Sequence, residues 1–249
     1  MAWDRHKYEQ FRAERLAPVH DLLALIRRRP GMRAIDLGCG TGDVTAMLAD
    51  ALDGAEVLGV DNSAEMLEEA WPRRREGLDF RQQAIEDVGG QWDLVFSNAA
   101  IHWVADHERL IPRLMSMVSP GGQLVVQAPR GHPASSLIKE VAQQAPFRSV
   151  LGEPRKGNTL GLLAYAELLY HSGGGDIVAV EKVYPHVLAD ADAMLAWAEG
   201  TALLPYMDRL DEPMQREFKQ RYLQMLRRRW PAKPVFFGFQ RMLLATTKT

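Results

Sequence analysis

The sequence has little cysteine and no long apolar run. Cys39 is the single cysteine among 249 residues, so no internal disulfide can form and no cysteine-built zinc site is available. No segment approaches the roughly 18 uninterrupted apolar residues that a membrane span needs, and the opening stretch MAWDRHKYEQ has no apolar core of a secretion signal. These absences predict a soluble, cytoplasmic protein with no membrane partner.

An excess of positive charge is also missing. The formal net charge is −2 and the pI is about 6.4, so no overall positive field exists to hold a nucleic acid. The arginine triplets at 27–29, 73–75 and 227–229 lie near predicted helix ends, where they offset the helix dipole.

The 7 histidines form no i, i+4 or H-x-E pair with ligand partners, which predicts metal-independent chemistry. We expect a small-molecule partner and no nucleic acid, and the sequence leaves monomer and homodimer open.

Strand-like and helix-like patterns alternate along most of the chain. Such alternation is typical of βαβ units, which form a mostly parallel sheet with helices on both faces. The sequence therefore predicts an α/β, Rossmann-like doubly wound fold. The predicted strands are 33–37, 56–60, 79–83, 94–97, 123–128, 176–184 and 241–246, and the predicted helices between the first five are 43–53, 63–75 and 107–118.

Additional helices are predicted around this sheet within one domain spanning 1–249. An N-terminal helical segment, 1–30, shows helical spacing until Pro30 and Gly31 interrupt it. Beyond Pro129 the alternation breaks, and two helical lid segments are expected at 130–172 and 190–237. The lid helices should cover 134–145, 159–171, 190–200 and 212–229.

The first predicted strand runs into the stretch DLGCGTG, residues 36–42. Gly38, Gly40 and Gly42 remove side chains at a strand-to-helix turn, so the backbone can bend tightly and approach a ligand. The dinucleotide fingerprint G-x-G-x-x-G requires a third glycine where this chain has Asp43. Asp36 can instead brace the loop and accept hydrogen bonds from a ligand's ammonium group.

A second acid, Asp61, closes the next strand, EVLGVD. A carboxylate there can accept hydrogen bonds from both hydroxyls of a ribose. In the alternative interpretation, the stretch from Asp61 to Ser63 is only an N-cap for the following helix. Two acids at neighbouring strand ends favour a cationic nucleoside, and S-adenosyl-L-methionine is the common cofactor that carries both an ammonium and a sulfonium. A dehydrogenase that binds NAD is the competing class.

Four motifs in residues 30–130 together resemble class I S-adenosylmethionine-dependent methyltransferases: DLGCGTG, VDNSAEM, WDLVFSNAAIHW and SPGGQLVV. The stretches WAEGTALLPY (197–206) and FQRMLLA (239–245), with Tyr8 and Phe11 in the first helix, resemble the trans-aconitate methyltransferase family. This resemblance implies seven strands with the last one antiparallel, and a cofactor across the ends of the first, second and fourth strands. It also implies an activity, methylation of a carboxylate of a small di- or tricarboxylic acid to a monomethyl ester.

The chain departs from the family pattern at two positions. Many relatives carry an acid near the end of the third strand to hold the adenine amino group, whereas this chain has Ala84 there. The resemblance then implies that adenine lies beside Ile85 and bonds to the backbone near it, with Glu86 as a nearby acceptor. In the lid, Leu204 stands where the family pattern places an arginine. That difference bears on whether the lid accepts trans-aconitate.

The resemblance assigns cofactor roles to a set of positions in this sequence. Asp36, Gly38 and Gly40 would hold the methionine end, and Asp61 the ribose. The remaining positions would border the adenosine, shape the loop after the fourth strand or close over the cofactor from the N-terminal helix: Asn62, Met66, Ala84, Ile85, Asn98, Tyr8 and Phe11.

An anionic acceptor requires positioning and positive charge more than it requires a base. A carboxylate is already ionised at neutral pH, and arginine's fork can bond both of its oxygens. Three alternatives stay open: a carrier-bound acyl carboxylate; a hydroxyl or amine with His102 or His132 as general base; and a protein that binds the cofactor without transferring its methyl group. The candidate substrate residues, each of which also has a packing or surface-charge interpretation, are His102, Trp103, Arg130, His132, Tyr184, His186 and Arg241.

Overall fold

A computed structural model describes residues 12–153, 158–200 and 202–249 of the chain. Tyr8 and Phe11, predicted to close over the cofactor, lie outside the described residues. Within those residues, no helix is long and apolar enough to cross a membrane.

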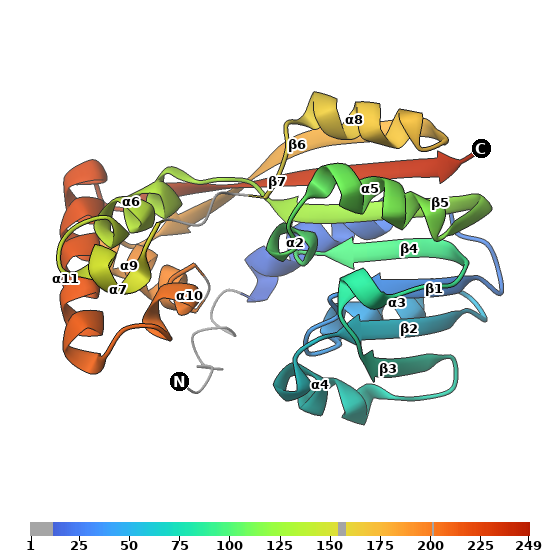
Figure 1. The fold of residues 1–249 in the computed structure, drawn as a ribbon, viewed down its shortest axis with the longest axis horizontal. Helices are drawn as coiled ribbons and strands as arrows, with labels where there is room; N and C mark the ends of the chain where they lie inside the picture. Colours follow the sequence, from blue (N-terminus) through green and yellow to red (C-terminus); the bar gives the residue numbers. More distant parts are fainter. Residues whose placement is uncertain (1–11, 154–157, 201) are drawn as a thin grey trace. The chain divides into compact units, whose positions relative to one another are not determined.

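The core of the fold is a seven-stranded sheet with the strand order β3-β2-β1-β4-β5-β7-β6 (Figure 1). β1 pairs in parallel with β2 and β4, and β4 pairs in parallel with β5. β7 runs antiparallel to β5, with Val126 opposite Leu244. The expected doubly wound sheet with an antiparallel last strand is therefore confirmed. The strands are β1 (Arg33–Leu37), β2 (Glu56–Asp61), β3 (Leu78–Gln82), β4 (Trp92–Asn98), β5 (Val118–Pro129), β6 (Gly174–Leu188) and β7 (Val235–Lys248).

Several helices begin at a residue whose side chain caps the first turn. Ser63 caps α4 through its hydroxyl, which accepts a hydrogen bond from the Met66 amide at 3.2 Å. Asp211 caps α11 through its carboxylate, which accepts from the Met214 amide at 2.9 Å. The described helices are α2 (Arg12–Ala24), α3 (Asp43–Ala51), α4 (Ala64–Ala70), η1 (Trp71–Arg73), η2 (Ile85–Asp87), η3 (Ile101–Trp103), α5 (His107–Ser116), α6 (Pro133–Ala142), α7 (Phe147–Leu151), α8 (Leu162–His171), α9 (Ala191–Glu199), α10 (Leu204–Met207) and α11 (Glu212–Arg229).

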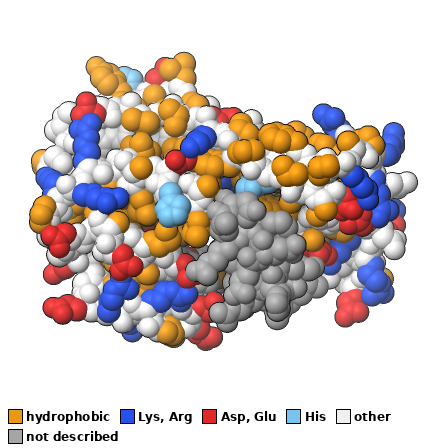
Figure 2. Space-filling model, turned by 180° about the vertical axis from the view of Figure 1, so that it is seen from behind, with side chains coloured by type: hydrophobic (Ala, Val, Ile, Leu, Met, Phe, Trp, Pro, Cys, Tyr) orange, Lys and Arg blue, Asp and Glu red, His pale blue; other side chains and the backbone are white. Residues whose placement is uncertain are grey.

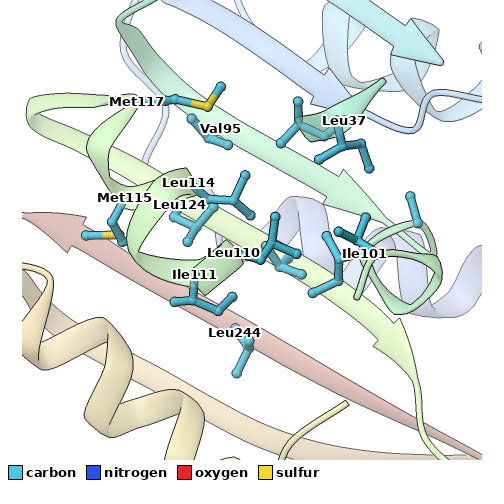
Figure 3. Packing of buried hydrophobic residues seen from close by; sticks show 14 of the residues in the cluster. Leu37, Val95, Ile101, Leu110, Ile111, Leu114, Met115, Met117, Leu124 and Leu244 are labelled. Atoms are coloured by element: carbon cyan, nitrogen blue, oxygen red, sulfur yellow. The ribbon is translucent and has the colours of Figure 1, made fainter. Parts of the chain in front are cut away.

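Alternate residues of the central strands pack into two different apolar layers. In β4, Leu94 and Phe96 belong to the layer with α2, α3 and α4, whereas Val95 belongs to the layer with α5 and α8. Figure 3 shows the second layer, in which Leu110 and Leu114 of α5 lie over the sheet. Because both faces are covered, the strands read as nearly continuous apolar runs, and the edge at which they end is left to carry polar groups.

The chain forms two compact units. The sheet unit comprises Ala17–Arg130, Gly157–Lys182 and Arg241–Thr249, and the helical unit includes Gly131–Lys156 and Val183–Gln240. The helical unit has its own core, to which α6, α7, α9, α10 and α11 contribute. The predicted lid range 130–172 includes α8, which belongs to the sheet unit because Tyr165 and Leu169 are buried in the α5 layer.

Charges of both signs are mixed on the surface. Figure 2 shows Lys and Arg side chains interspersed with Asp and Glu on the face that it draws. Many form exposed ion pairs, such as Arg27 with Asp176 at 2.7 Å and Arg227 with Asp192 at 2.9 Å. Such pairs leave little unbalanced positive charge, and the absence of a nucleic-acid partner stays a prediction.

Candidate functional site

The glycine loop between β1 and α3 lies against the ends of β2 and β4. The amides of Gly38 and Cys39 both donate to the Val60 carbonyl, at 2.8 and 2.9 Å. A side chain at Gly38 would place its Cβ 2.2 Å from Cβ of Ala100, whereas one at Gly40 would meet no atom within 4 Å. Gly38 is therefore required for close packing, and Gly40 borders open space that a ligand can occupy.

Asp36 is buried at the start of this loop with one of its two carboxylate oxygens unsatisfied. Oδ2 accepts a hydrogen bond from the Thr45 hydroxyl at 2.7 Å, and Oδ1 is buried with no hydrogen-bond partner. Burial raises the pKa of this carboxyl to about 7; the Thr45 hydrogen bond opposes the shift and nearby Asp61 adds to it. A buried oxygen of this kind is unusual unless a ligand satisfies it.

Asp61 connects the glycine loop to the start of α4 through its two carboxylate oxygens. Oδ2 accepts from the Gly40 amide and Oδ1 from the Ser63 amide, each at 2.9 Å. The N-cap of α4 is Ser63 itself, so capping does not account for Asp61. Each oxygen has a second lone pair, and the half-buried carboxylate retains capacity to accept hydrogen bonds from a ligand.

The predicted adenosine residues surround the ends of β2 and β3. Asn62 is exposed, and the Met66 side chain has 37% of its surface exposed. Ala84 is half-buried before η2, and Ile85 is buried, lying 3.7 Å from the position of a Cβ on Gly38. The structure thus brings Ile85 and the glycine loop together.

Arg113 of α5 fixes this η2 segment, although its sequence position gave no sign of that role. Its guanidinium donates to the carbonyls of Ile85 at 3.1 Å and Val88 at 2.5 Å. Both acceptors are backbone atoms, which no side-chain motif records. The Ile85 carbonyl therefore already has a donor within the protein.

The loop after β4 carries His102 and Trp103. Nδ1 of His102 is buried without a hydrogen-bond partner, and burial, followed by the nearby Arg241 and His107, lowers the pKa of His102 to about 4. Trp103 has 56% of its surface exposed, with its ring 4.7 Å from that of His102. A histidine with so low a pKa is neutral and weakly basic at neutral pH, so His102 is a poor general base.

Two buried residues that the motifs did not single out brace this loop. His107 Nδ1 contacts the Tyr165 hydroxyl, and its Nε2 donates to the Ile101 carbonyl at 2.9 Å. The same hydroxyl accepts from the Leu160 amide at 3.1 Å. With that amide as donor, the hydroxyl proton is available for His107 Nδ1, and the ring carries its own proton on Nε2. The pair locks η3 to α8.

The two predicted substrate arginines have different surroundings. Arg130 donates to the Leu160 carbonyl at 2.6 Å and pairs with Glu181 at 3.3 Å, so its charge is balanced inside the sheet unit. Arg241 approaches Oε1 of Gln127 at 3.5 Å, near the end of β5. Arg241 lies near the β4 loop, since its charge contributes to lowering the pKa of His102.

The remaining substrate candidates belong to the helical unit. His132 caps α6 by accepting the Ala134 amide at 3.0 Å through Nδ1, and burial lowers its pKa to about 4. His186 is buried with its ring 5.2 Å from that of Trp197, and Tyr184 is 5% exposed. Leu204 begins α10. A capping role for Nδ1 and a low pKa both make His132 a weak base at neutral pH.

No three His, Cys, Asp or Glu side chains of the described ranges gather closely enough to hold a metal ion. Metal-independent chemistry stays a prediction.

A family model described as a methyltransferase domain matches residues 28–171. Magnesium protoporphyrin IX methyltransferase from Synechocystis PCC 6803, solved with bound S-adenosylhomocysteine, superposes with a TM-score of 0.60 at 16% identity, covering 98% of this chain and 92% of that one. The chain therefore belongs to the class of methyltransferases, and its sheet order agrees with that assignment.

Curated relatives show which family of methyltransferases the chain belongs to. A trans-aconitate 2-methyltransferase from Deinococcus radiodurans is 42% identical over 255 aligned residues, covering 100% of this chain and 99% of the relative. Another of the same name, from Variovorax paradoxus, is 35% identical and covers 99% of this chain and 98% of the relative. The chain belongs to the trans-aconitate 2-methyltransferase family, which confirms the resemblance read from its motifs.

Proposed function

We propose that this protein transfers a methyl group from S-adenosyl-L-methionine to a carboxylate of trans-aconitate, giving a monomethyl ester. The observation that carries the proposal is the buried, unsatisfied Asp36 oxygen beside a glycine-rich loop that hydrogen-bonds to Asp61 through the Gly40 amide. Full-length relatives with that activity in their names support the choice of acceptor.

The residues at the glycine loop fit this cofactor. Asp36 would accept hydrogen bonds from the ammonium group through Oδ1, which has no partner within the protein. Gly40 leaves room for close approach, and the Asp61 carboxylate would accept from the ribose hydroxyls. Ile85 offers an apolar surface for the adenine, with Met66 and Asn62 nearby on α4 and its preceding turn. Ala84 supplies no acid, so the adenine amino group depends on other acceptors.

When bound, the cofactor supplies an electrophilic methyl group on a sulfonium. The protein's own contribution is to orient and desolvate the acceptor carboxylate, which is already ionised and needs no base. Arg241 supplies positive charge, while neutral His102 and exposed Trp103 line the loop without competing for a proton. Because positioning supplies most of the rate, the absence of a strong base among His102 and His132 is consistent with this chemistry.

The function is tested by incubating the protein with methyl-labelled S-adenosylmethionine and a panel of acids. We expect label to enter trans-aconitate as a base-labile ester and to enter citrate and itaconate more slowly. S-adenosylhomocysteine should raise the unfolding temperature, and NAD should not. Binding of S-adenosylhomocysteine with no transfer to any acid would instead support a protein that holds the cofactor without using it.

Cofactor affinity should rise with pH up to about 7. Asp36 titrates near that value in the ligand-free protein, and only its ionised form attracts the ammonium, so affinity should increase up to about tenfold per pH unit below 7 and level off above it. The stability of the ligand-free folded protein should change in the opposite direction, falling as pH rises. A raised carboxyl pKa stabilises the folded protein below about 4, and this contribution is lost as pH rises through about 7.

Calorimetry with S-adenosylhomocysteine between pH 6 and 9 measures this profile. Thr45→Val is the matched variant, because loss of the hydroxyl donor raises the Asp36 pKa and should move the profile to higher pH. Affinity that is flat across this range, or identical profiles for the two proteins, would contradict the role given to Asp36.

A further inference from the structure

A buried glutamine connects two of the candidate residues across three strands. Gln127 lies near the end of β5 and is 2% exposed. Its Nε2 donates to Oδ1 of Asn98, the last residue of β4, at 2.8 Å, and its Oε1 faces Nη1 of Arg241 on β7 at 3.5 Å. No motif in the sequence marks this glutamine, since its partners come from strands far apart in the chain.

The chemistry of arginine sets the direction of this chain of contacts. A guanidinium has donors and no acceptor, so the amide oxygen of Gln127 must face Arg241. The amide nitrogen then faces Asn98, which must accept through Oδ1. The Asn98 group left to act at the strand end is therefore its NH₂, which can only donate.

Asn98 and Arg241 lie where the expected chemistry requires donors. Asn98 ends β4 and precedes the loop that carries His102 and Trp103, and its neighbour Ala99 donates its amide to the Gln127 carbonyl at 2.9 Å. Arg241 is close enough to His102 for its charge to lower that pKa. A carboxylate bound there would meet an amide donor and a guanidinium.

We propose that Gln127 is a positioning residue that holds the Asn98 amide and the Arg241 guanidinium as donors for the substrate carboxylate. This inference rests on the proposed function. Gln127 itself would not contact the reacting atoms. It acts by fixing which end of the Asn98 amide is left for the substrate, and by holding the Arg241 guanidinium in position.

Two substitutions at Gln127 distinguish the effect of losing its hydrogen bonds from the effect of adding a negative charge. Gln127→Leu removes both hydrogen bonds and leaves Arg241 charged, so the KM for trans-aconitate should rise about tenfold. Gln127→Glu keeps the shape but lacks the donor for Asn98 and places a negative charge beside Arg241. Asn98 then presents its oxygen to an anionic substrate, and the KM should rise about a hundredfold.

The same strand provides a matched control. Gln123 is 4% exposed on β5, and its side chain also makes two hydrogen bonds, accepting from the Arg27 amide at 2.8 Å and donating to the Arg27 carbonyl at 2.7 Å. Gln123→Leu should therefore lower the unfolding temperature about as much as Gln127→Leu while leaving the KM for trans-aconitate unchanged.

Steady-state kinetics with trans-aconitate and calorimetry with S-adenosylhomocysteine test the positioning role of Gln127. The proposal is supported if the KM for trans-aconitate is highest for Gln127→Glu, lower for Gln127→Leu and lowest for the wild type. The affinity of every variant for S-adenosylhomocysteine should then stay within about threefold of the wild-type value. It is overturned if both Gln127 variants match Gln123→Leu in KM, or if the loss falls on S-adenosylhomocysteine affinity alone. Failure of the wild-type protein to methylate any acid would overturn the proposed function instead.

Discussion

Asp36→Asn is expected to weaken S-adenosylmethionine binding by about a hundredfold or more while making the ligand-free protein harder to unfold at pH 8. The buried carboxylate has one hydrogen bond, from Thr45, and an oxygen with no partner. Asparagine fills the same space and can still accept from Thr45. It has no charge to offer an ammonium group, and so the variant should lose the attraction proposed between Asp36 and the cofactor.

The gain in stability follows from the direction of the pKa shift. Because burial raises the Asp36 pKa to about 7, keeping the group ionised at pH 8 costs the folded protein free energy that the unfolded chain does not expend. Removing the charge should raise the free energy of unfolding by a few kcal/mol at most, at about 1.4 kcal/mol per unit of pKa shift. At pH 4, where the group is protonated in the folded protein, the difference should largely disappear.

Denaturant unfolding at pH 4 and pH 8, with calorimetry on the same samples, measures both effects. Thr45→Val serves as the control, since it disturbs the same hydrogen bond and leaves the charge in place. A variant that binds the cofactor normally, or one that is less stable than wild type at pH 8, would show that Asp36 is a structural acid with partners of its own.

Gly38→Ala is expected to destabilise the fold by about 3 kcal/mol or more, whereas Gly40→Ala should cost only about 1 kcal/mol. Both glycines have a positive φ, of 77° and 54°, so an alanine at either position carries backbone strain. Only at Gly38 does the new Cβ collide, at 2.2 Å, with Cβ of Ala100. At Gly40 the methyl group enters open space, where it should instead obstruct the cofactor.

Chemical denaturation of the two variants, with S-adenosylhomocysteine titrations, provides the comparison. Adding Ala100→Gly to Gly38→Ala should restore the part of the stability that the collision removes, and it should leave the backbone strain in place. Equal destabilisation by the two single substitutions would show that strain alone sets their cost. Unimpaired cofactor binding by Gly40→Ala would place the ligand elsewhere.

Much of the sheet was predictable because β1, β2 and β4 are short, mostly apolar and followed by a turn. The segment 212–229 was predicted as a helix and is α11, with Asp211 as its cap. The segment 63–75 becomes α4 followed by η1, because Pro72 lacks the amide hydrogen that would continue the α-helix. α7 and α10 were not predicted, since helices of 5 and 4 residues carry too little periodicity to recognise. β6 and β7 also extend beyond their predicted ends, into the helical unit.

The sequence alone determined the glycine loop, the two acids at neighbouring strand ends and the family that these motifs indicate. Each of these is a local pattern, in which the residue types and their spacing along the chain already specify the chemistry. The tertiary structure decided the rest. The unsatisfied oxygen of Asp36, the neutral state of His102 and the bridge from Asn98 through Gln127 to Arg241 all depend on burial and on contacts between distant strands, which spacing along the chain does not encode.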